Sequence, residues 1–346
     1  MKSFIAVIVC IFSVTSFAKT ISLMNYNAEN LFDTVHDEGK TDYTYLPLSV
    51  KEASQEIQDY CNSITVENWK NDCLYTDYNE DVLKAKISNL SKVIRTYNNG
   101  RGADIVVLQE VENLNVLNIL VDKGLKGLGY DHIALVEGPD GRGIDVGVLS
   151  KYPVDSKKLH EIDLSHMGLS TRGILEVNLK INNKTVTVFG NHWPSQHNPS
   201  EARLEASKKL KELANASVSN IVIATGDFNT TVNDIPNGID NLADTFIDVE
   251  RQARMRVFKN PWSGTHWFKG HWASLDRIFV KRNFHDVKLK FRSFHILAYK
   301  FLLGTKNLTD NDTGEVTVYQ NVPNRFSISN KTGYSDHLPI VFKFKL

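Results

Sequence analysis

The sequence has few cysteines, no long apolar run beyond its N-terminus and no excess of one charge, and each absence excludes a class of protein. Only three of its 346 residues are cysteines, and no Cys/His cluster has the spacing of a zinc site. Beyond the N-terminal segment, no apolar run approaches the length that crosses a bilayer. The 40 basic residues balance the 40 acidic ones, so no global field attracts a polyanion, and any contact with nucleic acid must be local.

The first 18 residues have the pattern of a secretory signal peptide. A basic start is followed by an apolar core from Phe4 to Ile11 and by a small-x-small site at Ser16-Phe17-Ala18. We therefore expect cleavage near Ala18 and a secreted or periplasmic mature protein. An N-terminal membrane anchor is the alternative, which the shortness of the apolar run disfavours.

Cys61 and Cys73 remain once the leader has taken Cys10 with it. Two cysteines in an exported chain favour one disulfide, with two free thiols as the alternative. Both lie in residues 34–80, an irregular, acidic and Tyr-rich stretch that we interpret as an inserted, partly helical loop pinned by the disulfide. Its aromatic side chains are expected to form a small local core, with contact to substrate as the alternative.

The rest of the mature chain, within residues 19–346, has the pattern of a single α/β domain. Apolar runs of strand length alternate with stretches of helical spacing, such as residues 82–97 and 200–216. No repeat, low-complexity tract or linker divides the chain. Nothing in the sequence indicates a stable protein partner, so we expect a monomer.

One strand and the turn after it organise the expected site. The apolar run Ile221 to Thr225 leads directly into Gly226-Asp227-Phe228-Asn229. Asp227 and Asn229 are two residues apart, so in extended chain their side chains would share a face. Ligands of open α/β sheets bind at such strand ends, although an Asx-rich turn that closes a core strand would have the same sequence.

Polar residues accompany five other predicted strands, four at a strand end and one, Asp276, within the strand. Glu110 and Asp336 offer carboxylate oxygens, which suit Mg²⁺ or Ca²⁺. Histidines can donate protons or contact phosphate, and each needs an acid that fixes its tautomer. The remaining residues at these strand ends are Asn27, His192 and His337.

These motifs, in this order, resemble the endonuclease/exonuclease/phosphatase superfamily, and most specifically its deoxyribonuclease-like branch. The matching segments span nearly all of the mature chain: Tyr26-Asn27, Asn30 to Asp33, Leu108-Gln109-Glu110, Gly190 to Trp193, Gly226 to Asn229, Leu275-Asp276-Arg277 and Ser335-Asp336-His337. The resemblance implies a four-layer α/β sandwich, in which two central mixed β-sheets are flanked by helices. The site is expected at one rim of the sheets.

The resemblance also implies a divalent-metal site. Asn27 and Glu110 would hold Mg²⁺, or Mn²⁺ or Ca²⁺, with Glu110 as the main ligand. Asp336 would contact a metal or its waters. Glu110 could also act as an acid at the N-terminus of a helix predicted over residues 112–123, and the two roles are compatible.

The catalytic roles follow from the same resemblance. Asp227 would orient or deprotonate the attacking water, and Asn229 would fix that water and the phosphate. His337 would bind a phosphate oxygen with Asp276 behind it. The alternative for Asp276 is a salt bridge with Arg277.

One further pair of residues and one arginine complete the expected site. His192 matches the second histidine of the deoxyribonuclease-like branch, and Asp145 would be its acid partner. Arg172 aligns with an arginine that contacts the substrate phosphate, with a surface ion pair as the alternative.

The expected function is that of an exported, divalent-metal-dependent phosphodiesterase that hydrolyses DNA by in-line attack of an activated water. A phospholipid or phosphoinositide phosphoesterase of the sphingomyelinase type is the alternative, since neutral charge does not favour DNA and the inserted aromatic loop could meet a membrane. A relative that only binds a partner would need a damaged site, and the motif residues show no damage.

Overall fold

The structure is a computed structural model that describes residues 19–256, 262–285, 287–310 and 313–346. The expected signal peptide lies outside the described residues. The helices are α1 (Leu48–Ala53), α2 (Gln55–Ser63), α3 (Glu67–Tyr75), α4 (Glu80–Thr96), α5 (Leu114–Ile119), η2 (Leu120–Gly124), α6 (Ser200–Ala216), α7 (Gly238–Asn241) and α8 (Val249–Arg254). Short 3₁₀ turns are η1 (Tyr43–Tyr45), η3 (Ser165–Met167), η4 (Phe291–Ser293) and η5 (Lys300–Leu302).

The strands fall into two large sheets and two hairpins. The first sheet has the order β13 (Lys288–Leu289), β17 (Ile340–Lys345), β1 (Thr20–Leu31), β2 (Ile105–Val111), β4 (Asp145–Ser150) and β3 (His132–Ala134), and β14 (His295–Ile296) also pairs with β17. The second has the order β5 (Val154–His160), β6 (Ile174–Ile181), β7 (Lys184–His192), β8 (Ile221–Asp227), β12 (Asp276–Lys281) and β9 (Phe246–Asp248). The hairpins are β10 (His266–Phe268) with β11 (His271–Ala273), and β15 (Leu303–Thr309) with β16 (Val316–Pro323).

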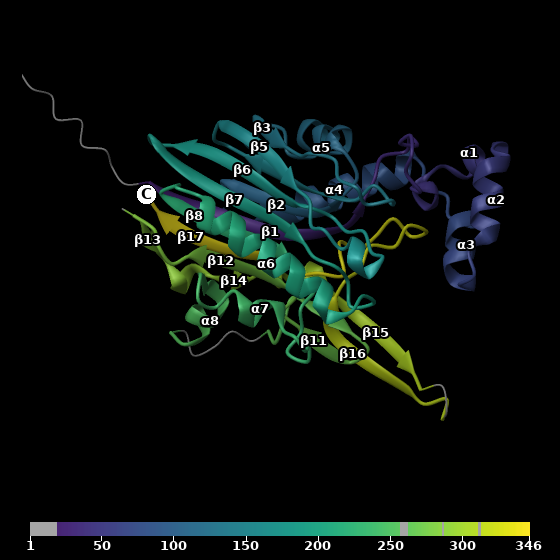
Figure 1. Ribbon diagram of the computed structural model, residues 1–346. Helices are drawn as coiled ribbons and strands as arrows, with labels where there is room; N and C mark the ends of the chain where they lie inside the picture. Colours follow the sequence, from purple (N-terminus) through teal and green to yellow (C-terminus); the bar gives the residue numbers. More distant parts are fainter. Residues whose placement is uncertain (1–18, 257–261, 286, 311–312) are drawn as a thin grey trace, which may run out of the picture.

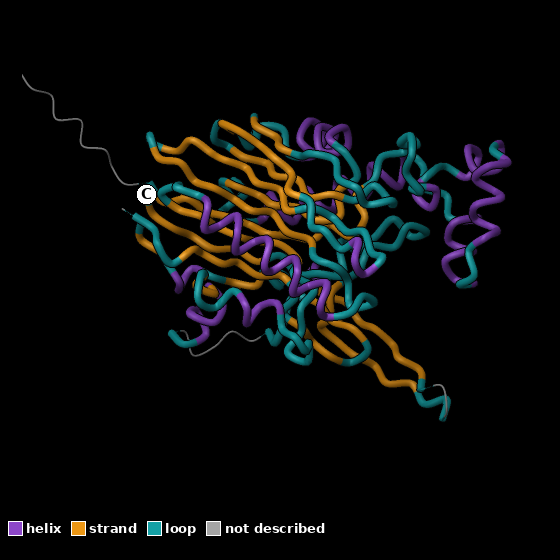
Figure 2. Tube along the Cα trace, viewed as in Figure 1, coloured by secondary structure: helices purple, strands orange, loops and turns teal. Residues whose placement is uncertain are grey.

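The two sheets pack face to face, with helices on their outer sides (Figures 1 and 2). Each sheet is mixed, because β1 with β2 and β7 with β8 are parallel while the other pairs are antiparallel. The contact between sheets is close at Gly190, where a Cβ atom would lie 2.6 Å from Val146 of β4. The expected sandwich of two central mixed sheets is therefore confirmed.

Apolar residues of the strands supply the core between the sheets. The central strands are buried on both faces, as in β8, where every residue from Ile221 to Asp227 is buried. The helix predicted over 200–216 forms as α6 and packs Ala202, Ala206 and Leu210 into a second apolar cluster on the outer side of β7 and β8. At the start of α4, the side chain of Asn79 accepts hydrogen bonds from the backbone N–H groups of Asp81 and Val82.

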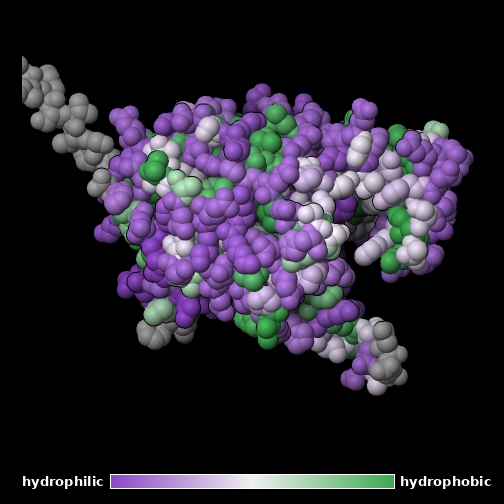
Figure 3. Space-filling model, in the orientation of Figure 1, coloured by the Kyte–Doolittle hydropathy of each residue, from purple (hydrophilic) through white to green (hydrophobic). Residues whose placement is uncertain are grey.

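The expected insertion forms a helical arm, which we define as residues 43–79 and which contains η1 and α1 to α3. It projects from one end of the sandwich in Figures 1 and 3. Cys61 and Cys73 form the expected disulfide, with Cα atoms 5.5 Å apart, inside a small core with Tyr43, Ile57 and Leu74. The expected local aromatic core is confirmed in part, since several aromatic side chains of the arm stay exposed.

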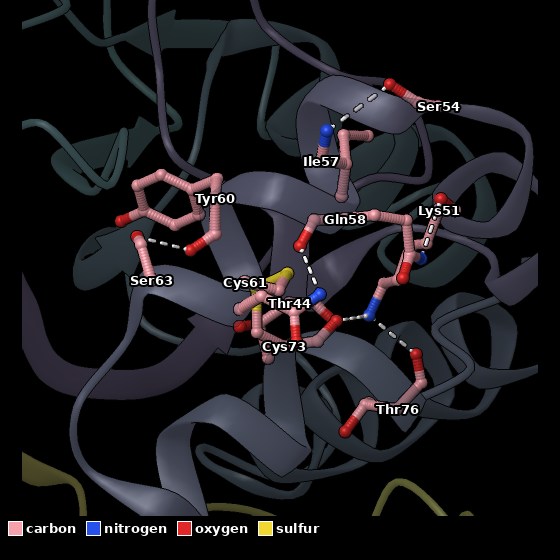
Figure 4. Close-up of a disulfide and its surroundings, with 11 residues drawn as sticks. Thr44, Lys51, Ser54, Ile57, Gln58, Tyr60, Cys61, Ser63, Cys73 and Thr76 are labelled. Carbon is pink, nitrogen blue, oxygen red and sulfur yellow. Dashed lines mark hydrogen bonds between the residues drawn. A yellow bond between two sulfur atoms is a disulfide. The ribbon is translucent and has the colours of Figure 1, made fainter.

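A buried lysine holds the arm together from within. The ammonium group of Lys51 donates hydrogen bonds to the backbone carbonyls of Thr44, Cys73 and Thr76, at 3.0, 2.9 and 2.7 Å (Figure 4). These bonds tie α1 to both ends of the arm and satisfy carbonyls at the end of α3.

No helix among the described residues combines the length and apolarity that a bilayer crossing requires.

Candidate active site

Strand register places three of the expected residues in a row. His192 at the end of β7 pairs with Asp227 in β8, and Asp227 pairs with Asp276 in β12. Side chains in register on neighbouring strands point to the same face of a sheet. Gly226 makes this approach possible, because a Cβ atom there would lie 2.0 Å from the carbonyl oxygen of Asn191. Asp276 begins its strand, whereas the sequence predicted it within one.

His337 is the second histidine at this face and is joined to Asp276. Its Nδ1 lies 2.6 Å from Asp276 Oδ2, and its Nε2 lies 3.8 Å from Asp227 Oδ2. Burial alone would lower the pKa of His337, but the carboxylate of Asp276 raises that pKa well above its usual range. The structure thus forms the expected His337–Asp276 pair. Arg277 instead bonds to Asp248, so the alternative salt bridge with Asp276 does not form.

His192 lies on the other side of Asp227 in a different setting. Its Nε2 is 3.8 Å from both Asp227 Oδ2 and Glu110 Oε1, while its Nδ1 is buried without a hydrogen-bond partner among the described residues. Burial, reinforced by the positive charge of Arg172, lowers the pKa of His192 well below its usual value. Two carboxylates beside Nε2 favour the neutral tautomer that carries its proton there.

Asp145 does not form the expected pair with His192 in the described part of the structure. Both of its carboxylate oxygens accept the backbone N–H of Gly138, at 3.0 and 3.2 Å. Burial raises the pKa of the Asp145 carboxyl to about 7, against the lowering effect of that N–H. Asp145 therefore serves the loop before β4 in this structure, while the imidazole of His192 is held by packing.

Glu110 and Asn27 meet where the first sheet reaches the same rim. Asn27 Nδ2 donates to Glu110 Oε1 and to Asp227 Oδ2, both at 3.2 Å, so it links the two sheets. Glu110 sits at a bulge between β2 and its neighbours, with φ +58°. A positive φ is uncommon for a residue with a side chain, and such strain gathers at functional sites.

Asn229 and Arg172 converge on the carbonyl oxygen of Trp193. Asn229 Nδ2 and Arg172 Nη2 donate to it at 3.1 and 3.0 Å. The backbone N–H of Asn229 donates to Asp227 Oδ1 at 2.9 Å, which fixes that carboxylate. Arg172 is buried and also pairs with Asp140 at 3.3 Å, so its ion pair is internal, whereas the sequence alternative placed it on the surface.

Asp336 lies beside His337 but belongs to a further cluster that the sequence did not reveal. Asp336 Oδ2 is 3.9 Å from Arg325, which also pairs with the buried carboxylate of Glu29. Burial raises the pKa of Glu29 to about 7, with the negative charge of Asp336 as the next cause. Lys86, fully buried, donates to the carbonyl oxygen of Glu29 at 2.8 Å.

His266 is the other residue that sequence reasoning missed. Its ring centroid lies 4.7 Å from that of His337, and the backbones of the two residues form a β-bridge. Ligand atoms of His266, Asp336 and His337 all lie within 4.8 Å of one another. Burial, and then the charge of His337, lowers the pKa of His266 to about 4. His266 stands in the sequence Gly264-Thr265-His266-Trp267, and nothing in that sequence indicates a contact with His337.

The residues at the rim fit a divalent metal by the chemistry of their donors. In the part of the chain that the structure describes, no Lys or Arg pairs with Glu110, whose partly exposed carboxylate accepts only from Asn27 and the backbone of Asn30. Carboxylate and amide oxygens are the ligands of hard cations such as Mg²⁺ and Ca²⁺. Asp336 has other neighbours in this arrangement, since its carboxylate lies 3.9 Å from both Arg325 and His337.

The sequence of the chain matches a known family of hydrolases, in agreement with the two facing sheets and the carboxylates and imidazoles at their rim. The Endonuclease/Exonuclease/phosphatase family matches residues 72–345, which is most of the chain. The protein therefore belongs to this family, whose members are phosphoric ester hydrolases and generally depend on a divalent metal. No curated protein matches the chain in sequence.

Solved structures of several other proteins have the same fold. Truncated TDP2 of Caenorhabditis elegans is 14% identical with a TM-score of 0.51, and the match covers 94% of this chain and 98% of that one. Sphingomyelinase C of Streptomyces griseocarneus is 14% identical with a TM-score of 0.51, covering 94% and 99%. ANGEL2, a 2′,3′-cyclic phosphatase, is 14% identical with a TM-score of 0.53, covering 95% and 96%. At these identities the likeness shows the fold alone.

Proposed function

We propose that this protein is a divalent-metal-dependent nuclease that hydrolyses phosphodiester bonds of DNA. The observation that carries the proposal is the arrangement around Asp227, whose Oδ2 lies 3.8 Å from Nε2 of both His192 and His337. The carboxylate provides a base, and the two imidazoles provide two separate contacts for a phosphodiester. The residues come from both sheets, and Asn27 joins the sheets at this point.

Asp227 is the group that accepts the proton of the attacking water. Burial raises its pKa to about 7, opposed by the charge of His337, and a general base works best when its pKa lies near the working pH. The backbone of Asn229 and the side chain of Asn27 each bond one oxygen of this carboxylate, so its orientation is fixed before substrate binds.

His337 and Asn229 stabilise the negative charge that grows on the phosphoryl oxygens. The Asp276 carboxylate keeps His337 protonated, so an imidazolium faces the site. The amide of Asn229 is held in place by the carbonyl of Trp193 and supplies a donor at little cost of reorganisation. Arg172 adds positive charge behind the same carbonyl.

His192 acts on the oxygen that leaves. As a neutral imidazole with its proton on Nε2, it donates a hydrogen bond to that oxygen, and 3.8 Å separates Nε2 from the Asp227 carboxylate. The P–O bond to the leaving alcohol breaks as the bond from water forms. The leaving oxygen takes a proton from solvent and Asp227 returns to solvent the proton that it took from water, so the enzyme ends as it began and His192 keeps its proton on Nε2.

Glu110 and Asn27 would hold the divalent metal, with Asp336 near its waters. When bound, that cation supplies charge neutralisation at the phosphate. Glu110 is well placed for it because the bulge in β2 turns this residue out of the ladder at the rim.

We also propose that the protein is exported, as a single domain that follows the leader. The Cys61–Cys73 disulfide supports this, because disulfides persist in oxidising compartments. A secreted or periplasmic nuclease would meet DNA outside the cytoplasm.

Substrate assays test the proposal directly. Purified mature protein would be given duplex DNA, single-stranded DNA, RNA and sphingomyelin, each with Mg²⁺ and with chelator. We expect metal-dependent cleavage of DNA. Hydrolysis of sphingomyelin without cleavage of DNA would replace the nuclease by the phospholipid phosphoesterase, and activity on none of the four would leave a binding protein.

A further inference from the structure

A cleft of about 780 Å³ lies between the arm and the body of the protein. Helix α3 and the segment after it form one wall, and the stretch from Arg325 to Lys331 contributes the other. Tyr45 lies in the lining, with its ring stacked on Phe32 at 4.0 Å between centroids. Figure 3 shows the arm as an overhang beside the body.

One end of the cleft adjoins the candidate metal site through residues 29 and 30. Glu29 and Asn30 belong to its lining, and the backbone N–H of Asn30 donates to Glu110 Oε2 at 3.1 Å. Arg325 stands at the same junction, with 64% of its side chain exposed while it pairs with Glu29 and lies 3.9 Å from Asp336. A phosphate at Glu110 would therefore lie next to this end of the cleft, within reach of a group bound in it.

The chemistry of the walls combines aromatic rings with hydrogen-bonding groups. Tyr75, at the end of α3, leaves 68% of its surface exposed, and Phe326 contributes a second ring. The side chains of Asn71 and Asp72 supply donors and acceptors along the α3 side. Planar, polar-edged groups such as nucleobases are bound by rings on their faces and by amides and carboxylates on their edges.

We propose that this cleft binds an unpaired nucleoside next to the scissile phosphate, with Tyr75 as the stacking surface. The enzyme would then prefer single-stranded or frayed DNA to intact duplex. The inference rests on the proposed nuclease function and adds a substrate class to it. A base inside a duplex has both faces covered by its neighbours, so it must leave the stack before a protein ring can cover it.

A choline head group is the competing occupant, and charge does not separate the two, since Glu29, Asp72 and Asp77 line the cleft as well as the cations. Arg325 lies at the end of the cleft that meets the site, and Lys331 lines the same wall. The phosphate of either occupant gains from the guanidinium of Arg325. The side chains of Asn71 and Asp72 favour the nucleobase, because its edges carry donors and acceptors and a quaternary ammonium has neither.

The disulfide and Lys51 fix the position of the stacking residue. Tyr75 follows Cys73 by two residues at the C-terminal end of α3. The Cys61–Cys73 bond and the Lys51 hydrogen bonds to Cys73 and Thr76 therefore hold the backbone on both sides of Tyr75. A rigid arm lowers the entropic cost of ordering the ring when a base binds.

The test compares two exposed aromatic residues of the same helix. Tyr75→Ala removes the cleft ring, whereas Trp69→Ala removes a ring that is 57% exposed and does not line the cleft. Each disulfide-bonded variant would be assayed on a single-stranded oligonucleotide, a matching hairpin duplex and bis(4-nitrophenyl) phosphate, a small diester that reports the chemistry. Tyr75→Phe keeps the ring and serves as the rescue variant.

We expect Tyr75→Ala to lower kcat/KM on the single strand roughly 5- to 150-fold, the range of base–ring stacking. Its turnover of the small diester, and the activities of Tyr75→Phe and Trp69→Ala, should stay near wild type. Cleavage of DNA with no difference between Tyr75→Ala and Trp69→Ala would overturn the cleft assignment and leave the nuclease function standing. Wild-type hydrolysis of sphingomyelin without DNA cleavage would instead overturn the proposed function itself.

Discussion

The two sides of Asp227 hold one histidine each and treat them in opposite ways. On the β12 side, His337 has an acid behind it, since Asp276 lies 2.6 Å from Nδ1. On the β7 side, His192 has no hydrogen-bond partner at Nδ1 in the described part of the chain. Both rings present Nε2 to the same carboxylate oxygen at 3.8 Å.

The contrast shows that distance to a shared carboxylate does not decide the charge of a buried imidazole. The charge depends on whether an acid contacts the other ring nitrogen, Nδ1. Asp276 raises the pKa of His337, whereas burial and Arg172 lower that of His192. One face of a phosphodiester would thus meet a cation and the other a neutral donor.

The largest effect is expected at Glu110, which lies on the His192 side. Glu110→Gln removes the carboxylate that we propose as the principal metal ligand and keeps the size of the side chain, so turnover should be lost and the fold retained. Activity on DNA across a Mg²⁺ titration, with circular dichroism for the fold, measures this. Glu161→Gln, at an exposed position, is the matched control. Normal Mg²⁺-dependent turnover by Glu110→Gln would remove this residue from the site.

The next effect concerns the paired histidine. His337→Ala and Asp276→Asn should each lower kcat by about 10³-fold or more, at the upper end of general acid–base effects. The double variant should be no worse than His337→Ala, because groups that act as a unit are not additive. Steady-state kinetics of the three variants decide the matter. Multiplicative losses would mean that Asp276 acts independently of His337.

A smaller loss is expected for the unpaired histidine. His192→Ala should lower kcat on duplex DNA by about 10²-fold, since it removes a neutral hydrogen-bond donor and leaves the His337 imidazolium in place. The rate is compared with that of His337→Ala on the same substrate. If His192→Ala cleaves at nearly the wild-type rate while His337→Ala is inactive, the assignment to the deoxyribonuclease-like branch fails and the family assignment remains.

The smallest catalytic effect is expected at Asp145, whose role is in stability. Asp145→Asn should change kcat less than threefold, because its carboxylate bonds to Gly138 and no pair with His192 forms. A loss as large as that of His192→Ala would show instead that the two residues do act as a pair, in a geometry that substrate induces.

The same variant changes how stability depends on pH. The pKa of Asp145 is about 7 in the folded protein and about 3.9 unfolded, so the folded state binds this proton more tightly. Stability from this group is therefore present below pH 4 and is lost as the pH rises to about 7. We expect the melting temperature of wild type to fall more than that of Asp145→Asn between pH 5 and pH 8. Equal falls would contradict the raised pKa.

Much of the framework was predictable because it depends on local patterns. Buried strands such as Ile221–Asp227 and the helix Ser200–Ala216 follow from apolar spacing that tertiary contacts do not override. The motif order also predicted that His337 and Asp276 would meet, although 61 residues separate them.

The misses share a physical cause. Glu29 and Arg325 come together only through the tertiary fold, almost 300 residues apart, and neither stands in a pattern that suggests a partner. Asp145 was assigned to His192 from the resemblance, but a backbone N–H seven residues earlier competes for its carboxylate. Competition between buried partners for one hydrogen-bonding group produces no periodic pattern in the sequence.

The register of β7, β8 and β12 also has a consequence for engineering. His192, Asp227 and Asp276 stand side by side because backbone hydrogen bonds align their strands, so the spacing of the three side chains is a property of the ladder. The connections between these strands, including the one that carries α6, can then be lengthened, shortened or exchanged with those of relatives while the spacing of the row is retained. A one-residue slip of β8 would instead turn Asp227 to the opposite face, and no repair in the connecting segments would bring it back.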